Sequence, residues 1–149
     1  MTALATRPLD ARDIEDVLAI QAACPEMAQW TAWDYDRAAR GEMAAWVAEG
    51  EGGEIAGFIV ARRVASDLEI LNFAVRPSLR RQGVGGALLG EALRWAQTFE
   101  AQQAFLEVRM SNLAALRFYE RHNFQVSGRR PRYYTAPIED ALLLSLSLS

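Results

Sequence analysis

The amino-acid sequence predicts a single α+β (mixed α/β) domain over residues 1–149, built around one mostly antiparallel sheet. Three strand-like segments follow one another between residues 44 and 75, a long segment with helical periodicity comes directly after them, and strand and helix patterns then alternate. A chain of 149 residues that is 51% hydrophobic and 23% charged can bury one compact core. Disorder and a multidomain arrangement are therefore not expected.

The first 43 residues contain one short strand and two helix candidates. We expect an extended segment over Thr6–Leu9 and then a helix with an apolar stripe between Ile14 and Ala22. Asp10 or Asp13 is a suitable cap for that helix, because a short acidic side chain can accept a hydrogen bond from a free amide of the first turn. A second short helix is expected over Asp34–Arg40.

Three strands are expected next, over Ala44–Ala48, Ile55–Val64 and Leu68–Val75, which are rich in Val, Ile, Phe and Trp. A glycine-rich turn joins the first two, and Pro77 closes the third. Strands in direct succession with tight connections predict an antiparallel meander.

Helical periodicity begins at Gly83 and continues to Phe99, which predicts a helix of about four turns. Asn123 is a suitable left-handed stop for the helix that follows. The later elements, in order, are the strand Ala104–Val108, the helix Leu113–Arg121 capped by Ser111 or Asn112, and the strands Gln125–Arg130 and Leu142–Leu148. The whole chain thus predicts about seven strands and about four helices.

Composition excludes several classes of protein. The 16 basic residues are all Arg and the formal net charge is -3. The sequence has one cysteine, Cys24, and one histidine, His122. A net acidic chain has no overall attraction to nucleic acid or an anionic membrane. One Cys with one His is too few for a disulfide framework or for a metal site built only from thiolates and imidazoles. The lack of Lys excludes P-loop and Schiff-base mechanisms. The chain has no 18-residue apolar run and no signal-peptide pattern, so we expect a cytoplasmic protein.

A glycine-rich turn lies between the third strand of the meander and the long helix, in the sequence Arg80–Ala87. Free amides at a helix N-terminus, together with Arg76, Arg80 and Arg81, are typical of a phosphate or pyrophosphate site. The turn lacks the position and the acidic partner of a dinucleotide-binding fingerprint. A glycine turn with solvated arginines is the alternative.

Glu107 is a carboxylate inside an otherwise apolar strand, where an unpaired charge would be costly. It is either one half of an ion pair with a neighbour such as Arg109 or Arg76, or a general base. Asn112 and Tyr119 lie two helical turns apart on one face, so both could contact one elongated ligand. The alternative is that Asn112 only caps the helix and Tyr119 fills the core.

Several motifs occur in a fixed order between residues 72 and 124: Phe73–Pro77, Arg80–Leu89, Leu106–Arg109, Ser111–Asn112, Ala115, Phe118–Glu120 and Asn123–Phe124. In this order and spacing they resemble the GNAT superfamily of acetyl-CoA-dependent N-acetyltransferases. The tail, Gly128–Tyr134 followed by Glu139–Ala141, resembles the RimI branch, which acetylates the N-terminal alanine of a ribosomal protein. Trp30 stands at the Pro-Trp position of that branch, with Gln29 in place of the Pro.

The resemblance implies a GNAT fold whose central sheet splays between Leu71–Val75 and Phe105–Val108, with acetyl-CoA as the cosubstrate in the splay. Backbone groups of Phe73 and Val75 would pair with the pantetheine arm, and Asn112 would fix its thiol end. The residues that the resemblance implies for acetyl-CoA binding are Phe73, Ala74, Val75, Arg80, Arg81, Gln82, Gly83, Val84, Gly85, Gly86 and Asn112.

The resemblance also implies catalytic roles, with Glu107 as the general base and Tyr119 as the acid that protonates the departing thiolate. The Val75 amide would stabilise the oxyanion. Trp30, Arg132, Tyr133 and Tyr134 would contact the acceptor, whereas the alternatives are core packing for Trp30 and a solvated hairpin for the other three. His122 is expected at a helix C-terminus, and Cys24 as a small buried hydrophobe.

The leading hypothesis is therefore a RimI-like enzyme that transfers acetyl from acetyl-CoA to the N-terminal α-amine of a protein, for which a ribosomal protein is the candidate. An α-amine has a pKa of about 7.7 to 8.0, against about 10.4 for a lysine side chain, which favours an N-terminal acceptor at neutral pH. The alternatives are a GNAT enzyme that acetylates a small-molecule amine and a non-catalytic acyl-CoA-binding module.

Overall fold

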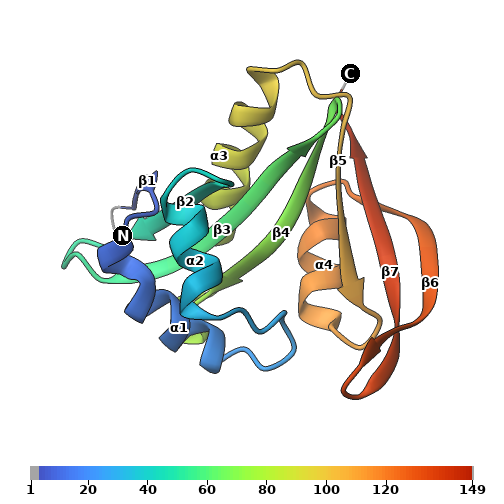
Figure 1. Cartoon of the computed structure of the whole chain (residues 1–149), viewed down its shortest axis with the longest axis horizontal. Coiled ribbons are helices and arrows are strands. Elements are labelled where there is room, and N and C mark those ends of the chain that lie inside the picture. Colours follow the sequence, from blue (N-terminus) through green and yellow to red (C-terminus); the bar gives the residue numbers. More distant parts are fainter. Residues whose placement is uncertain (1–3, 149) are drawn as a thin grey trace.

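The computed structural model describes residues 4–148, which form one seven-stranded sheet with helices on both faces (Figure 1). Mixed α/β architecture, seven strands and four α-helices were all predicted by the sequence, and the structure confirms them. The strand order is β1-β2-β3-β4-β5-β7-β6. The elements are β1 Ala5–Pro8, α1 Ile14–Ala22, α2 Ala32–Ala39, β2 Ala44–Glu49, β3 Ile55–Val64, β4 Asp67–Val75, α3 Val84–Gln97, β5 Gln103–Arg109, α4 Leu113–Arg121, β6 Gln125–Thr135 and β7 Ile138–Ser147, with short 3₁₀ turns at Ala11–Asp13 and Pro77–Leu79.

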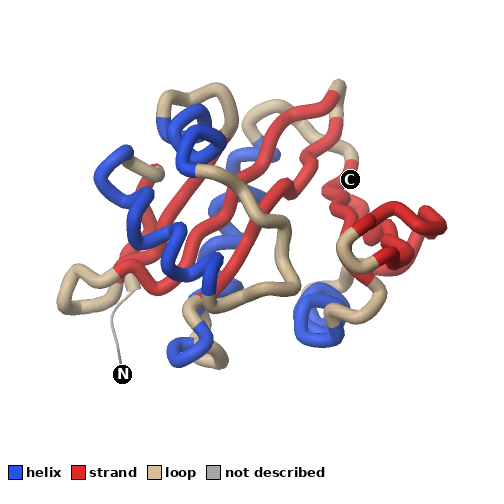
Figure 2. Tube along the Cα trace, turned by 60° about the horizontal axis from the view of Figure 1, so that its bottom comes forward, coloured by secondary structure: helices blue, strands red, loops and turns tan. Residues whose placement is uncertain are grey.

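The sheet splays between β4 and β5, which are its only parallel neighbours in the described chain. Their ladder consists of two residue pairs, Leu68 with Ala104 and Glu69 with Phe105. Beyond these pairs the strands diverge, so that β5, β6 and β7 stand apart from β1–β4 along most of their length (Figures 1 and 2). The expected splay is therefore present.

A bulge in β4 accompanies the splay. Val60 of β3 pairs with Asn72, whereas the next residue, Ala61, pairs with Ile70, which leaves Leu71 without a partner in the ladder. An extra residue bends a strand and changes which face its later side chains occupy. Consequently Ile70 and Phe73 both face α3, while Asn72 faces α1 and α2.

Two apolar clusters hold the helices to the sheet. On one face α3 buries Leu88 and Leu89 against strand residues that include Ile59 and Leu68. On the other face α1 and α2 bury side chains such as Ile20 and Tyr35 over the opposite side of β2 and β3. No helix within residues 4–148 is long and apolar enough to span a membrane.

The main departures from the predicted boundaries lie in the C-terminal hairpin. The sequence predicts that β6 ends at Arg130 and β7 begins at Leu142. In the structure β6 continues to Thr135 and β7 already begins at Ile138. The β6–β7 register shifts between Arg130 and Tyr134, and Arg132 has a positive φ of 52°. This bulged, mostly exposed segment has no period-2 hydrophobic pattern from which a strand could be predicted.

Asp10 and Asp13, both candidate caps, have different roles. Asp10 caps the 3₁₀ turn, whereas Asp13, 3% exposed, accepts two hydrogen bonds from the Arg7 guanidinium, at 2.7 and 2.8 Å, and one from the Asp10 amide at 2.9 Å. Burial alone would raise the pKa of Asp13, but these hydrogen bonds outweigh it and lower the pKa. The ion pair therefore stabilises the fold above the pKa of an unfolded Asp, near 3.9, and that stabilisation is lost as the pH falls through the lower folded-state value.

We expect Asp13→Asn to lower the free energy of unfolding by about 2 kcal/mol at pH 7, because a buried charge-assisted pair is replaced by a weaker neutral contact. The difference from wild type should shrink in urea titrations at pH 3 and below. Asp36→Asn is the matched control, since its ion pair with Arg40 is exposed and should change stability by less than about 0.5 kcal/mol. Equal losses for the two variants would contradict this account.

Candidate functional site

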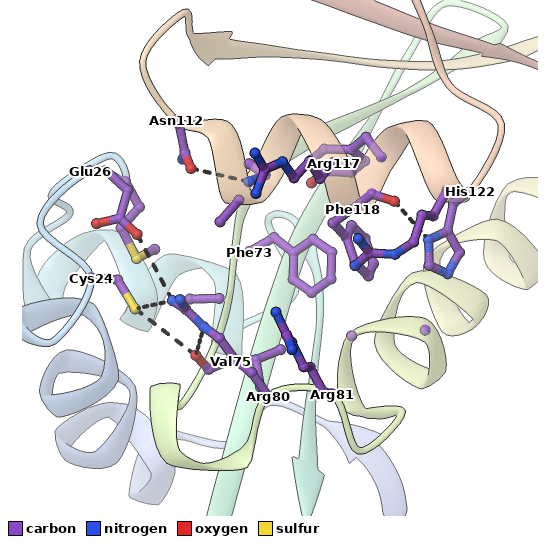
Figure 3. Close-up of a pocket in the computed structure, with 18 of the residues that line it drawn as sticks. Cys24, Glu26, Phe73, Val75, Arg80, Arg81, Asn112, Arg117, Phe118 and His122 are labelled. Atoms are coloured by element: carbon purple, nitrogen blue, oxygen red, sulfur yellow. Dashed lines mark hydrogen bonds and ion pairs between the residues drawn. The ribbon is translucent and has the colours of Figure 1, made fainter.

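A cavity of about 480 Å³ opens in the splay, between the end of β4, the N-terminus of α3 and one face of α4 (Figure 3). This volume is in the range of small-molecule and cofactor sites. Its walls include many of the residues that the sequence analysis selected: Phe73, Ala74, Val75, Arg80, Arg81, Gly83, Gly85, Gly86, Asn112 and Tyr119.

The backbone of β4 presents to this cavity groups that the sheet does not use, and of these the Val75 carbonyl accepts hydrogen bonds from Arg80 Nε at 3.4 Å and Cys24 Sγ at 4.0 Å. The Arg76 amide donates to the Ala56 carbonyl at 2.7 Å, so residues 76 and 56 form a hydrogen-bonded pair of the antiparallel β3–β4 ladder. Such pairs alternate along a ladder, and the backbone groups of Phe73 and Val75 therefore point away from β3. Because β5 has already diverged, these groups face the splay.

The N-terminus of α3 supplies a second set of free donors. Gly83, at a φ of 84°, precedes the helix, and the first intrahelical hydrogen bond is donated by Ala87 to Gly83. The amides of Val84, Gly85 and Gly86 thus have no partner inside the helix, and the helix dipole adds positive potential there. Val84 can contribute only this amide, because its side chain is buried in the core at 2% exposure.

The arginines near the turn separate into different roles. Arg80 extends across the cavity, with Nη2 3.3 Å from Cys24 Sγ and 3.9 Å from the Glu26 carboxylate. Arg81 lines the cavity, whereas the exposed Gln82 does not. The expectation that Arg76 serves the same anion site is wrong: its guanidinium donates two hydrogen bonds to the Ile55 carbonyl, at 3.2 and 3.0 Å, because it follows Val75 and so faces the other side of the sheet.

Two segments of the cavity wall were missed by sequence reasoning. Cys24, Glu26 and Met27 come from the connection between α1 and α2, which carries no motif. Arg117 and Arg121 lie on α4 in an i, i+4 pair, a spacing that could have placed them on one helix face. With Arg80 and Arg81, the charged lining is four arginines and one glutamate, a balance suited to an anionic ligand.

His122 and Cys24 have the surroundings that the sequence predicts. His122 follows the last turn of α4, and its Nδ1 lies 2.9 Å from the Phe118 carbonyl. Cys24 is 2% exposed, and burial raises the pKa of its thiol.

Asn112 and Tyr119 both reach the cavity from α4. Asn112 is the N-cap, its Oδ1 accepts a hydrogen bond from the Ala115 amide at 3.1 Å, and the residue lines the cavity. Tyr119 packs against Phe73 and Phe118, with ring centroids 6.1 and 5.3 Å away. Its hydroxyl has no hydrogen-bond partner among residues 4–148, and burial raises its pKa above the ordinary value.

Glu107 does not line this cavity, because Leu106 and Val108 face the α3 side of β5 and Glu107 alternates to the opposite face. Its Oε2 lies 3.2 Å from Arg130 Nε, in an ion pair without hydrogen-bond geometry. The predicted partners Arg109 and Arg76 are therefore wrong. Arg109 instead pairs with Glu139, at 3.2 Å.

The two tyrosines of β6 lie close to Glu107. The negative charge of Glu107 is the main cause that raises the pKa of Tyr133, and Tyr134 has a pKa raised to about 12 by burial and then by Glu107. A carboxylate and two phenols thus share the face of the sheet opposite α3 and α4. Arg132 contacts Asp140 instead, whose carboxylate accepts a hydrogen bond from the Arg132 backbone amide at 2.9 Å. Within residues 4–148 no hydrogen bond or ion pair joins Arg132 to Glu107, Tyr133 or Tyr134.

Trp30 does not line the cavity either. Its ring lies 5.3 Å from that of Tyr35, and its backbone is hydrogen-bonded to Gln21. In this structure Trp30 therefore makes the packing contacts that the alternative interpretation expects.

A splayed sheet, a β4 edge that faces the splay and a glycine-rich helix N-terminus together are the architecture of acyl-CoA-dependent transferases. A profile of the acetyltransferase (GNAT) family matches residues 14–124, and this chain belongs to that family. Its relatives are named N-acetyltransferases, and this chain is an enzyme of that kind. The [ribosomal protein bS18]-alanine N-acetyltransferase of Escherichia coli (strain K12) is 35% identical over 101 residues, which are 66% of this chain and 68% of that protein.

A Bacillus subtilis (strain 168) protein is 30% identical over 149 residues, which are 99% of this chain and 98% of that protein. Its name gives it the same bS18-alanine N-acetyltransferase activity provisionally. Among solved structures, Ard1 from Thermoplasma volcanium matches with a TM-score of 0.88 at 28% identity and covers 99% of both chains. The ribosomal-protein-S18-alanine N-acetyltransferase from Escherichia coli matches with a TM-score of 0.82 at 26% identity, over 99% of this chain and 95% of that one.

Replacement of Gly85 and Gly86 tests how tightly α4 closes this site. A Cβ on Gly85 would lie 2.8 Å from Phe118 Cε1, whereas one on Gly86 would meet only His122 Nε2, at 3.6 Å. We expect Gly86→Ala to raise the free energy of unfolding by about 0.5 to 1 kcal/mol, as Gly to Ala does in a helix, and Gly85→Ala to lower it by about 1 kcal/mol or more through overpacking. Urea denaturation of the ligand-free protein measures both, and a stabilised Gly85→Ala variant would show that Phe118 moves freely.

Proposed function

We propose that this protein transfers the acetyl group of acetyl-CoA to the N-terminal α-amine of a protein. The observation that carries this proposal is that the open edge of β4 and the free amides of α3 face one cavity. The first suits the amides of a pantetheine arm and the second suits a pyrophosphate. Arg81, Arg117 and Arg121 add charge for the phosphates beside them.

Acetyl-CoA supplies an activated thioester, and the protein residues position it and move the protons. The amide of Val75, which points into the splay, can donate a hydrogen bond to the developing oxyanion. Glu107 can accept a proton from the attacking amine, directly or through water, on the face opposite Tyr119. Tyr119 is protonated at neutral pH, as a tyrosine of ordinary pKa about 10 is, so its hydroxyl can donate a hydrogen bond and then the proton to the departing thiolate.

The acceptor is proposed to approach Glu107 between Tyr133, Tyr134 and the α1–α2 connection. The aromatic rings offer apolar contact, and the carboxylate attracts the amine. An α-amine is partly neutral at pH 7 to 8, so a weak base is sufficient. The bS18-alanine specificity in the names of the relatives supports an acceptor peptide that begins with Ala.

The acceptor class is tested by measuring CoA thiol release with a peptide that begins with Ala and, in parallel, with a panel of polyamines and aminoglycoside-type amines. Mass spectrometry of the peptide then locates the added acetyl group. Turnover with the peptide and acetylation at its α-amine support the proposal. Turnover with small amines alone would refute it in favour of a small-molecule acetyltransferase.

We expect Tyr119→Phe to lower kcat by about 10²-fold or more, since a positioned general acid is removed. The melting temperature and acetyl-CoA affinity should stay near wild type, because the hydroxyl makes no hydrogen bond within the described residues and the ring packing is kept. Glu107→Gln should lower kcat by a similar factor. Stopped-flow or steady-state thiol release measures both, and an unchanged kcat in the two variants would show that Glu107 and Tyr119 are not the catalytic residues. Wild-type protein that binds acetyl-CoA and releases no thiol with any acceptor would indicate a binding module instead.

A further inference from the structure

The connection between α1 and α2, residues 23–31, forms one wall of the cavity and contains no helix or strand. Cys24 and Glu26 approach Arg80 and Val75 from this segment (Figure 3). The buried Cys24 fixes the start of this segment, but it does not hold residues 28–31 at a fixed distance from β4. The position of these residues must therefore be set by other contacts.

Those contacts are a buried polar chain of Gln21, Tyr35 and Asn72. Gln21, at the end of α1, accepts a hydrogen bond from the Trp30 amide at 3.0 Å and donates one to the Trp30 carbonyl at 2.8 Å. The Tyr35 hydroxyl, from α2, donates to the same Gln21 oxygen. Asn72, from β4, donates to the Tyr35 hydroxyl at 3.0 Å and to the Ala28 carbonyl at 3.3 Å.

The three side chains are buried, with 6%, 0% and 5% of their surface exposed for Gln21, Tyr35 and Asn72. Buried polar groups are costly unless their hydrogen bonds are made, so this chain is satisfied only when residues 28 and 30 are in place. The position of the loop is thereby coupled to β4. Asn72 directly follows the β4 bulge, and the next residue, Phe73, enters the cavity from the opposite face.

The loop lies on the same face of the sheet as Glu107. Asn72 and Tyr35 belong to the α1–α2 side, and Glu107 points to that side because its neighbours Leu106 and Val108 face α3. In the proposed function, the amine reaches Glu107 from this face of the sheet. The phosphate-binding features, by contrast, are on α3 and α4.

We propose that Gln21, Tyr35 and Asn72 are positioning residues that hold residues 23–31 as the acceptor-side wall of the site. They contact neither donor nor acceptor, and they act through the backbone of Ala28 and Trp30. This inference rests on the proposed function, since it assigns the wall to the acceptor. The segment also lines the acetyl-CoA cavity through Cys24, Glu26 and Met27, but the helix amides and the cavity arginines come from α3, the turn before it and α4. Loss of the chain should therefore weaken acceptor recognition much more than acetyl-CoA binding.

Tyr35→Phe tests the chain, because it removes the hydroxyl that joins Asn72 to Gln21 and keeps the ring against Trp30 and Phe58. We expect the KM for the Ala-initiated peptide to rise about tenfold, as a displaced binding wall can cost an order of magnitude or more, while the Kd of acetyl-CoA changes by less than about twofold. Asn72→Leu, which removes the donor and keeps a similar size, tests the same link from β4 if Tyr35→Phe does not fold.

Ile20→Val is the matched control. It lies beside Gln21 in α1, is fully buried, and costs a comparable amount of stability without touching the polar chain. The inference is supported if the peptide KM rises in Tyr35→Phe and not in Ile20→Val. It is overturned if both variants raise the KM equally, or if neither does while wild-type enzyme acetylates the peptide. A wild-type enzyme that acetylates no peptide would instead refute the proposed function.

Discussion

The short parallel ladder between β4 and β5 is the constraint on which the rest of this structure depends. Two residue pairs join the halves of the sheet, and beyond them β4 pairs with no strand on that side within residues 4–148. Unpaired backbone donors and acceptors inside a protein must find partners, so an open strand edge that lines a cavity is suited to a ligand with amide groups. The bulge at Leu71 and the turn into α3 then direct Phe73, Val75 and the helix amides to the same space.

The splay also separates the groups suited to the acyl donor from the carboxylate and tyrosines proposed for the acceptor, on two faces of the sheet. On the α3 and α4 face lie the helix amides, the cavity arginines and Tyr119, which together suit an anionic thioester donor. On the other face lie Glu107, Tyr133 and Tyr134, and the α1–α2 connection packs on that same face. An enzyme that joins two substrates needs its base and its acid on opposite sides of the reacting atoms, and this sheet supplies that separation.

The sequence was informative where a local signal was sufficient. Periodicity predicted β3 over Ile55–Val64 and α4 over Leu113–Arg121 with the bounds observed, and Asn123 has the left-handed φ of 71° expected of a helix stop. Long-range partners were harder. The apolar strand around Glu107 indicated either a cation partner or a catalytic role, but only the folded structure shows that the cation beside it is Arg130, 23 residues along the chain.

The acceptor wall could not be predicted for the same reason. The connection between α1 and α2 has no motif, and its position depends on hydrogen bonds from Gln21 and Asn72, which are 51 residues apart in sequence. Asn72 is an ordinary residue in a strand pattern until the bulge places it on the α1 and α2 face, next to Tyr35. Composition and periodicity carry no information about such a pairing, whereas the motifs of the donor side lie within residues 72–124 and were found directly.

Amide hydrogen–deuterium exchange with and without CoA tests the central claim most directly, namely that the splay receives the acyl donor. The account predicts slower exchange at the amides of Phe73, Val75, Val84, Gly85 and Gly86 when CoA is bound, and no change in β1 and β2. Saturating CoA that slows exchange elsewhere but leaves β4 and the first turn of α3 unchanged would contradict it.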